Sequence, residues 1–196
     1  MSASTALSPV ILPPVCPVAI EPMPNNLHDH IKAGDGKRDE SIEKVIKMLS
    51  MMREFDIGMV CFNFMAHIGW LRTSVHIEER GGAYVTGFDM ADFQAGDASI
   101  SEQELWANYE YFIKAVIPYA EQNGIRLALH PDDPPVKKLG GVSRIIISAE
   151  NIRHAIYDIV KSDCLGLTMC QANFHIMGEN VEQTIKEFAD KIFFIH

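Results

Sequence analysis

Five polar side chains stand directly after apolar runs that are predicted to be strands. The runs and the residues that follow them are 15–20 with Glu21, 57–62 with Asn63, 125–129 with His130, 165–169 with Cys170, and 192–195 with His196. Two imidazoles and one thiolate on successive strands form a plausible ligand set for a divalent transition metal that accepts nitrogen and sulfur. A carboxylate is expected as a further ligand if the metal is manganese or iron(II).

Each of these residues also has a simpler interpretation. A cysteine at the end of a strand is most often a small buried apolar side chain. Glu21 is either a carboxylate of the site or an ordinary loop acid. Ligand-type residues at three consecutive strand ends nevertheless favour a metal site over coincidence. The other histidines lack this alignment and are predicted to be structural or at the surface: His28, His30, His67, His76, His154 and His175.

The segment 130–135, His-Pro-Asp-Asp-Pro-Pro, is the strongest local signal. Its three prolines restrict the backbone, which would hold a histidine and two carboxylates rigidly at a strand end. Asp132 or Asp133 could orient His130 through its second ring nitrogen. The alternative is a rigid turn in which an aspartate caps backbone amides. We favour the functional interpretation.

Amphipathic segments with helical periodicity separate the apolar runs. Helices are predicted at residues 39–52, 101–123, 152–159 and 180–188. Ser101-x-x-Glu104 has the spacing of a capping box, and Gly124 follows the same helix as a stop signal. In the last helix, Val181, Ile185 and Phe188 are expected to face inward.

Alternating strands and helices with almost wholly apolar strands are typical of a parallel sheet covered by helices. No glycine-rich phosphate-binding turn of the doubly wound folds occurs in the sequence. The sequence therefore predicts an α/β protein, a partial (β/α)8 TIM barrel of about five parallel strands with covering helices. Such a barrel carries its active site at the carboxyl ends of the strands. Residues 1–14 are predicted to be a flexible N-terminal segment and 15–196 the partial barrel domain.

The charge balance limits the kind of partner. The 196 residues contain 17 Lys and Arg against 26 Asp and Glu, a formal net charge of −9. No basic patch for nucleic acid or anionic lipid is present, so we expect a small-molecule ligand, no nucleic acid and no membrane. Four cysteines without paired spacing, together with no convincing targeting segment, favour a cytoplasmic protein with reduced thiols. The open edges of an incomplete barrel predict a homo-oligomer.

The motifs resemble those of the mannonate dehydratases, metal-dependent lyases of hexuronate breakdown with a xylose-isomerase-like barrel. The resemblance covers the chain from about residue 15 to its end, and its most specific motifs are Cys-Phe-Asn-Phe-Met at 61–65, Trp-x-Arg-Thr at 70–73, His-Pro-Asp-Asp-Pro-Pro at 130–135 and Gly-Leu-Thr-Met-Cys-Gln at 166–171. It implies that D-mannonate is converted to 2-dehydro-3-deoxy-D-gluconate and water (EC 4.2.1.8), in glucuronate breakdown.

The resemblance also assigns residues. It implies that His130, Cys170 and His196 bind Mn²⁺ or Fe²⁺ and that Asn63 and Arg72 contact a sugar acid substrate. The family's fourth ligand, an aspartate, and its catalytic arginine and tyrosine region lie beyond the last strand of this sequence, which leaves the catalytic residues unassigned. Two alternatives remain: a sugar isomerase or epimerase on the same barrel, and a catalytically inactive fragment that only associates with other chains.

Overall fold

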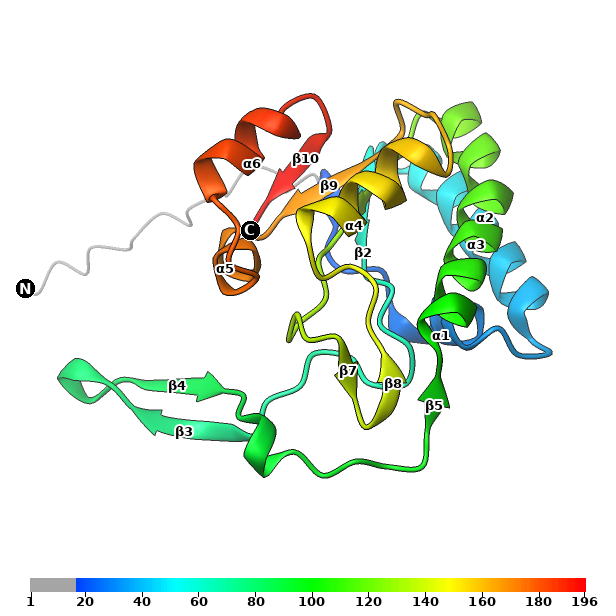
Figure 1. Cartoon of the computed structure of the whole chain (residues 1–196). Helices are drawn as coiled ribbons and strands as arrows, with labels where there is room; N and C mark the ends of the chain where they lie inside the picture. The colour runs from blue at the N-terminus through cyan, green and yellow to red at the C-terminus, as the bar shows by residue number, and fades with distance from the viewer. Residues whose placement is uncertain (1–16) are drawn as a thin grey trace, which may run out of the picture.

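A single parallel sheet forms the centre of the computed structural model, which describes residues 17–196. Its strands lie in the order β1-β2-β6-β9-β10 and have the bounds β1 (Ala19–Ile20), β2 (Met59–Phe62), β6 (Arg126–Leu129), β9 (Leu165–Met169) and β10 (Ile192–Ile195). Every pairing in this sheet is parallel. The sheet curls with helices packed on its outside (Figure 1), which confirms the predicted partial barrel of five parallel strands.

In the described residues, six α-helices connect and cover these strands. They are α1 (Asn25–Ala33), α2 (Arg38–Glu54), α3 (Glu102–Asn123), α4 (Ala149–Arg153), α5 (Gln171–Ile176) and α6 (Val181–Glu187). The helix predicted at 152–159 is α4 followed by a π-helical turn, His154–Asp158. Helix α1 was not predicted, because its polar sequence reads as a loop. Gly34 caps its C-terminal end with a φ of 68°, which favours glycine, and a Cβ at this position would lie 2.5 Å from the Asn108 side chain.

The predicted capping box of α3 is confirmed. The Ser101 hydroxyl accepts the Glu104 amide hydrogen at 3.2 Å, and the Glu104 carboxylate accepts the Ser101 amide hydrogen at 2.9 Å. At the other end, Gly124 has a left-handed φ of 66°. These caps satisfy backbone groups that the ends of a helix leave free, and they set the length of α3 at 22 residues.

Aromatic side chains hold α3 against the outer side of the sheet. The Phe64 and Tyr109 rings meet edge to face with centroids 5.1 Å apart, and the Phe62 and Phe112 rings do so at 5.9 Å. All four side chains are fully buried. Because Phe62 ends β2 and Phe64 is the second residue of the loop after it, this packing fixes where that loop leaves the barrel.

Other predictions needed correction. Phe188 is buried as expected, but Val181 is only half-buried and Ile185 is 40% exposed, because α6 has only seven residues and lies at the margin of the sheet. Of the strand expected at 15–20, only Ala19–Ile20 form β1, residues 17 and 18 lie outside it, and residues 15 and 16 are not among the described residues. The expected flexible segment 1–14 lies outside the described residues.

Two small sheets were also missed, since both interrupt segments that read as loops. β3 (Ser74–Glu78) and β4 (Tyr84–Gly87) form an antiparallel hairpin that extends away from the body (Figure 1). β5 (Ser99–Ile100), β7 (Lys138–Leu139) and β8 (Gly141–Ser143) form a second sheet in the order β5-β8-β7. Among the described residues, no helix combines the length and apolar character needed to span a membrane.

Candidate metal centre and its cavity

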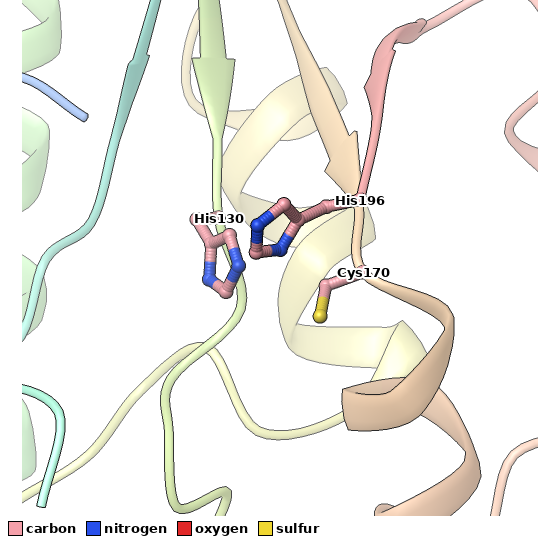
Figure 2. Close-up of side chains that lie close together, drawn as sticks. All are labelled: His130, Cys170 and His196. Carbon is pink, nitrogen blue, oxygen red and sulfur yellow. The ribbon is translucent and has the colours of Figure 1, made fainter. Parts of the chain in front are cut away.

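Three neighbouring strands bring the three predicted ligands together. His130, Cys170 and His196 directly follow β6, β9 and β10, which are adjacent and parallel, so that their carboxyl ends share one rim. One ligand atom from each residue lies within 4.8 Å of the others. Figure 2 shows the two imidazole rings beside each other and the Cys170 side chain next to them. The strand-end argument therefore identified a real cluster, while its metal binding stays a prediction.

His130 presents one free ring nitrogen to this cluster. Its side chain is buried, and Nδ1 donates to the Pro131 carbonyl oxygen at 2.6 Å. Within the described part of the chain, Nε2 has no hydrogen-bond partner. Burial lowers the pKa of His130, which favours the neutral imidazole. A neutral imidazole with Nδ1 protonated leaves the Nε2 lone pair available to a metal ion.

Neither aspartate of the loop orients His130, so that part of the prediction was wrong. The buried Asp132 carboxylate accepts the amide hydrogens of Ile145 and Ile146, both at 3.0 Å, which is the turn-capping role considered as the alternative. Asp133 instead pairs with Arg72. The carbonyl oxygen of Pro131 takes the place of a carboxylate because the loop backbone bends back onto the ring.

A side chain of α5, the helix that directly follows Cys170, holds this cysteine in place. Its Sγ donates to Asn173 Oδ1 at 3.0 Å, and Asn173 Nδ2 donates to the Asp132 carbonyl oxygen at 2.8 Å. Burial raises the pKa of Cys170. A neutral thiol is therefore favoured until a cation compensates the charge of the thiolate.

His196 completes the cluster from the strand at the margin of the sheet. β10 pairs with β9 so that Ile195 stands beside Met169, and the His196 amide donates to the Met169 carbonyl oxygen at 3.0 Å. The His196 and His130 ring centroids are 5.5 Å apart at an interplanar angle of 75°. Strand pairing thus places the His196 ring against the buried His130 ring.

The two predicted substrate-binding residues lie in different surroundings. Arg72 lines a cavity of about 500 Å³ together with Asp133, Cys170 and His196. Asn63 does not line this cavity. It is buried, its Oδ1 accepts the Met65 amide hydrogen at 3.2 Å, and its Nδ2 has no partner among the described residues. Only Arg72 therefore shares a cavity with candidate ligands, and the substrate contact of each residue stays a prediction.

Several residues near the site escaped the sequence analysis. The Trp70 ring meets the His130 ring edge-on, with centroids 6.0 Å apart. Arg144 is 1% exposed, and its Nη2 donates to the Gly69 carbonyl oxygen at 3.1 Å. No local pattern marks a buried arginine, because charged residues in a loop read as surface. Glu21 lies outside the cluster of candidate ligands and is exposed.

Comparison with known proteins decides the family. The model of the D-mannonate dehydratase (UxuA) family matches residues 18–99 and 92–196. The chain belongs to the mannonate dehydratase family. The mannonate dehydratase of Streptococcus pneumoniae (strain 70585) is 31% identical over 208 residues, which cover 90% of this chain and 56% of that protein. The mannonate dehydratase of Oceanobacillus iheyensis is 32% identical, with 87% and 56% covered.

Solved structures give the same family and the same barrel. The crystal structure of mannonate dehydratase from Streptococcus suis serotype 2 superposes with a TM-score of 0.81 at 31% identity, covering 93% of this chain and 54% of that one. An L-ribulose 3-epimerase superposes with a TM-score of 0.59 at 17% identity, covering 91% and 48%, which shows a shared fold alone. The chain spans about half the length of the mannonate dehydratases that it matches.

The donor set of the cluster fits a metal ion of the borderline type. It offers two imidazole nitrogens and one sulfur, and the free Nε2 of the buried His130 has no other use in the described structure. Unpaired buried polar atoms are costly, so an atom of this kind indicates a missing partner. Three protein ligands are also the number that leaves coordination positions open for a substrate.

Proposed function

We propose that this chain carries the metal-binding half of a mannonate dehydratase, in which D-mannonate loses water to give 2-dehydro-3-deoxy-D-gluconate. The observation that supports this proposal is the cluster of His130, Cys170 and His196 in a chain of this family. The reaction removes the proton from C2 and the hydroxyl from C3. The resulting C2–C3 enol then becomes the 2-keto acid.

The three ligands would hold Mn²⁺ or Fe²⁺, which when bound supplies a Lewis acid that increases the acidity of the C2 proton beside the carboxylate. The chain's own residues prepare the site. The Pro131 carbonyl oxygen fixes the tautomer of His130, and Asn173 holds Cys170 next to it. The groups that accept the C2 proton and protonate the leaving hydroxide are expected in the family's sequence beyond β10.

The wider assignment follows from the same proposal. We place the reaction in glucuronate breakdown in the cytoplasm. The substrate is a small sugar acid, and the protein binds neither nucleic acid nor a membrane. It forms homo-oligomers. The net charge of −9 supports the absence of a nucleic-acid partner, since an excess of acidic residues repels phosphates.

A metal titration of the 196-residue chain tests the site itself. The free Mn²⁺ signal in electron paramagnetic resonance is measured for the wild type, His130→Ala and the control His154→Ala, an exposed histidine outside the cluster. We expect His130→Ala to weaken Mn²⁺ binding more than about tenfold, because changing only a residue that orients a ligand already costs about 10–100-fold. Identical curves for wild type and His130→Ala would remove His130 from the site.

A hybrid protein tests the reaction. In it, this chain replaces the matching part of the Streptococcus suis enzyme, so that the remaining strands are restored. We expect the hybrid to form the 2-keto acid from D-mannonate and to lose this activity with His130→Ala. A folded, metal-loaded hybrid that instead isomerises or epimerises ketoses would favour a sugar isomerase or epimerase. The shared fold is the observation that supports this second enzyme class.

A further inference from the structure

One ion pair in the cavity of the candidate metal centre has a geometry that limits how a sugar acid can lie there. Arg72 Nη1 donates to Asp133 Oδ1 at 3.0 Å, and Arg72 Nη2 donates to Asp133 Oδ2 at 2.7 Å. The two residues are 61 positions apart in sequence. This is a bidentate pair of a guanidinium and a carboxylate. Its two parallel hydrogen bonds fix the orientation of the two planar groups relative to each other and hold their opposite charges in contact.

The pair is anchored on both sides. The Asp133 amide donates to Met65 Sδ at 3.3 Å, which ties its loop to the segment that carries Arg72. Arg72 Nη1 also donates to the Leu71 carbonyl oxygen at 2.8 Å, and the Gly69 carbonyl oxygen is held by the buried Arg144. The loops after β2 and β6 are therefore joined at this point, and the pair is part of the wall of the cavity.

The charges of this wall decide which end of a ligand it accepts. Arg72 is the one arginine or lysine that lines the 500 Å³ cavity in the described part of the chain, and Asp133 already neutralises it. The hydrogen bonds that Arg72 donates to the Asp133 carboxylate raise the pKa of Arg72, so the guanidinium keeps its proton. A ligand carboxylate placed on Arg72 would lie beside the Asp133 carboxylate, and like charges at such a distance repel.

The pair still has hydrogen-bonding capacity for uncharged groups. A guanidinium has five N–H donors, of which three are used by Asp133 and the Leu71 carbonyl oxygen. The carboxylate oxygens of Asp133 keep free lone pairs. Donors and acceptors side by side suit the hydroxyl groups of a polyol, each of which both donates and accepts.

We propose that the Arg72–Asp133 pair binds the hydroxyl-bearing end of the sugar acid, and that the carboxylate end is thereby directed toward His130, Cys170 and His196. This inference rests on the proposed function for the identity of the ligand. Arg72 is then a specificity-determining residue for the polyol tail, and Asp133 prevents it from capturing the carboxylate. A cavity of this volume is in the usual range of small-molecule sites.

Ligand binding to the 196-residue chain tests the proposal. Saturation-transfer NMR titrations are made with D-mannonate, which has both ends, and with D-mannitol, which has only hydroxyls. Arg72→Met should weaken the binding of both ligands by the same factor, about fivefold or more and equal within about twofold. Arg80→Met, an exposed arginine in the turn of the β3–β4 hairpin, should leave both unchanged. A loss confined to D-mannonate, no loss for either ligand, or no binding to wild type would overturn the proposal.

Asp133→Asn gives an independent measurement, because it leaves Arg72 as an uncompensated cation. Glycolate, which has a carboxylate and almost no tail, should bind this variant about tenfold more tightly than it binds the wild type. Unchanged glycolate binding in a variant with wild-type circular dichroism would contradict the role of Asp133. The two proposals fail separately. If the hybrid dehydrates D-mannonate but Arg72→Met weakens only D-mannonate binding, the proposed function stands and the proposed role of the Arg72–Asp133 pair is wrong. If Arg72→Met weakens the binding of D-mannonate and D-mannitol equally but the hybrid has no dehydratase activity, the role of the pair stands and the proposed function is wrong.

Discussion

The Asn173 side chain lies between Cys170 and the loop of His130, with Oδ1 3.0 Å from Cys170 Sγ and Nδ2 2.8 Å from the Asp132 carbonyl oxygen. One amide thus ties the candidate ligand Cys170 to the loop that carries His130. Residues around a metal centre orient its ligands, so Asn173 should affect metal affinity although it is not itself a ligand.

Asn173→Ala should weaken Mn²⁺ binding by about tenfold, since changes to residues that orient the ligands typically cost about 10–100-fold in metal affinity. Competition between the chain and a metal-sensitive dye measures this directly. The control is Gln171→Ala, an exposed position of the same helix, which should bind like the wild type. Equal affinities for Asn173→Ala and wild type would mean that this amide does not position the candidate ligands.

Stability should decrease as the pH is lowered, because of His28. Burial lowers its pKa from 6.5 to about 3, so the folded protein keeps it neutral while the unfolded chain takes up a proton below pH 6.5. The contribution of neutral His28 to the free energy of unfolding is complete above pH 6.5. It is lost as the pH falls toward 3, at up to about 1.4 kcal/mol per pH unit. The free energy of unfolding of His28→Gln, from urea titrations at pH 7.5 to 5, should therefore change less steeply than that of the wild type. The control His175→Gln removes an exposed histidine and should keep the wild-type slope.

Gly166 determines how closely β10 approaches β9, and through it where His196 lies. A Cβ at Gly166 would come 2.4 Å from the Lys191 carbonyl oxygen and 2.5 Å from the Phe193 ring. Gly166→Ala should thus cost about 1–3 kcal/mol of unfolding free energy and also weaken Mn²⁺ binding. Gly58→Ala, where nothing lies within 4 Å of the added Cβ, is the matched control. A Gly166→Ala protein with unaltered melting and metal binding would show that β10 can move away without loss.

The 196-residue chain alone should show no measurable dehydration of D-mannonate. It spans about half of its relatives' length, and the acid and base groups expected beyond β10 typically contribute about 10²–10⁴-fold to the rate. Formation of the 2-keto acid in the presence of Mn²⁺ is the measurement, with the Streptococcus suis enzyme as reference. If mass spectrometry verifies the 196-residue chain and its turnover is close to that of the reference enzyme, the prediction is contradicted.

The chain should self-associate through its outer strands. β1 and β10 stand at the two ends of the sheet, and Ile195 is 65% exposed on β10. Unpaired strand edges bind other strands, and a lysine on the edge hinders this. Light scattering should therefore show smaller particles for Ile195→Lys than for wild type. Ile185→Lys makes the same change on helix α6, where no strand edge is open, and should behave like wild type. A monodisperse wild-type monomer would refute this prediction.

The sequence alone determined the approximate positions of the five strands of the parallel sheet and of the candidate ligands at their ends, but not the strands of the two small sheets. Apolar runs between amphipathic helices are local patterns, and they survive folding because each depends on neighbours in sequence. His130, Cys170 and His196 could be grouped from their places in the chain, since the carboxyl ends of parallel strands share one rim. The capping box of Ser101 and Glu104 is local in the same way, and it too was predicted correctly.

The tertiary structure alone decided which groups these residues contact. The Pro131 carbonyl, not an aspartate, orients His130, and Asp133 pairs with Arg72 across 61 residues. Ile185 has the periodicity of a core residue but is exposed, and Arg144 is buried although loop charges usually are not. Such contacts depend on how loops from different strands meet in space. Periodicity along the chain holds no information about that meeting, because side chains far apart in sequence become neighbours only when the sheet curls.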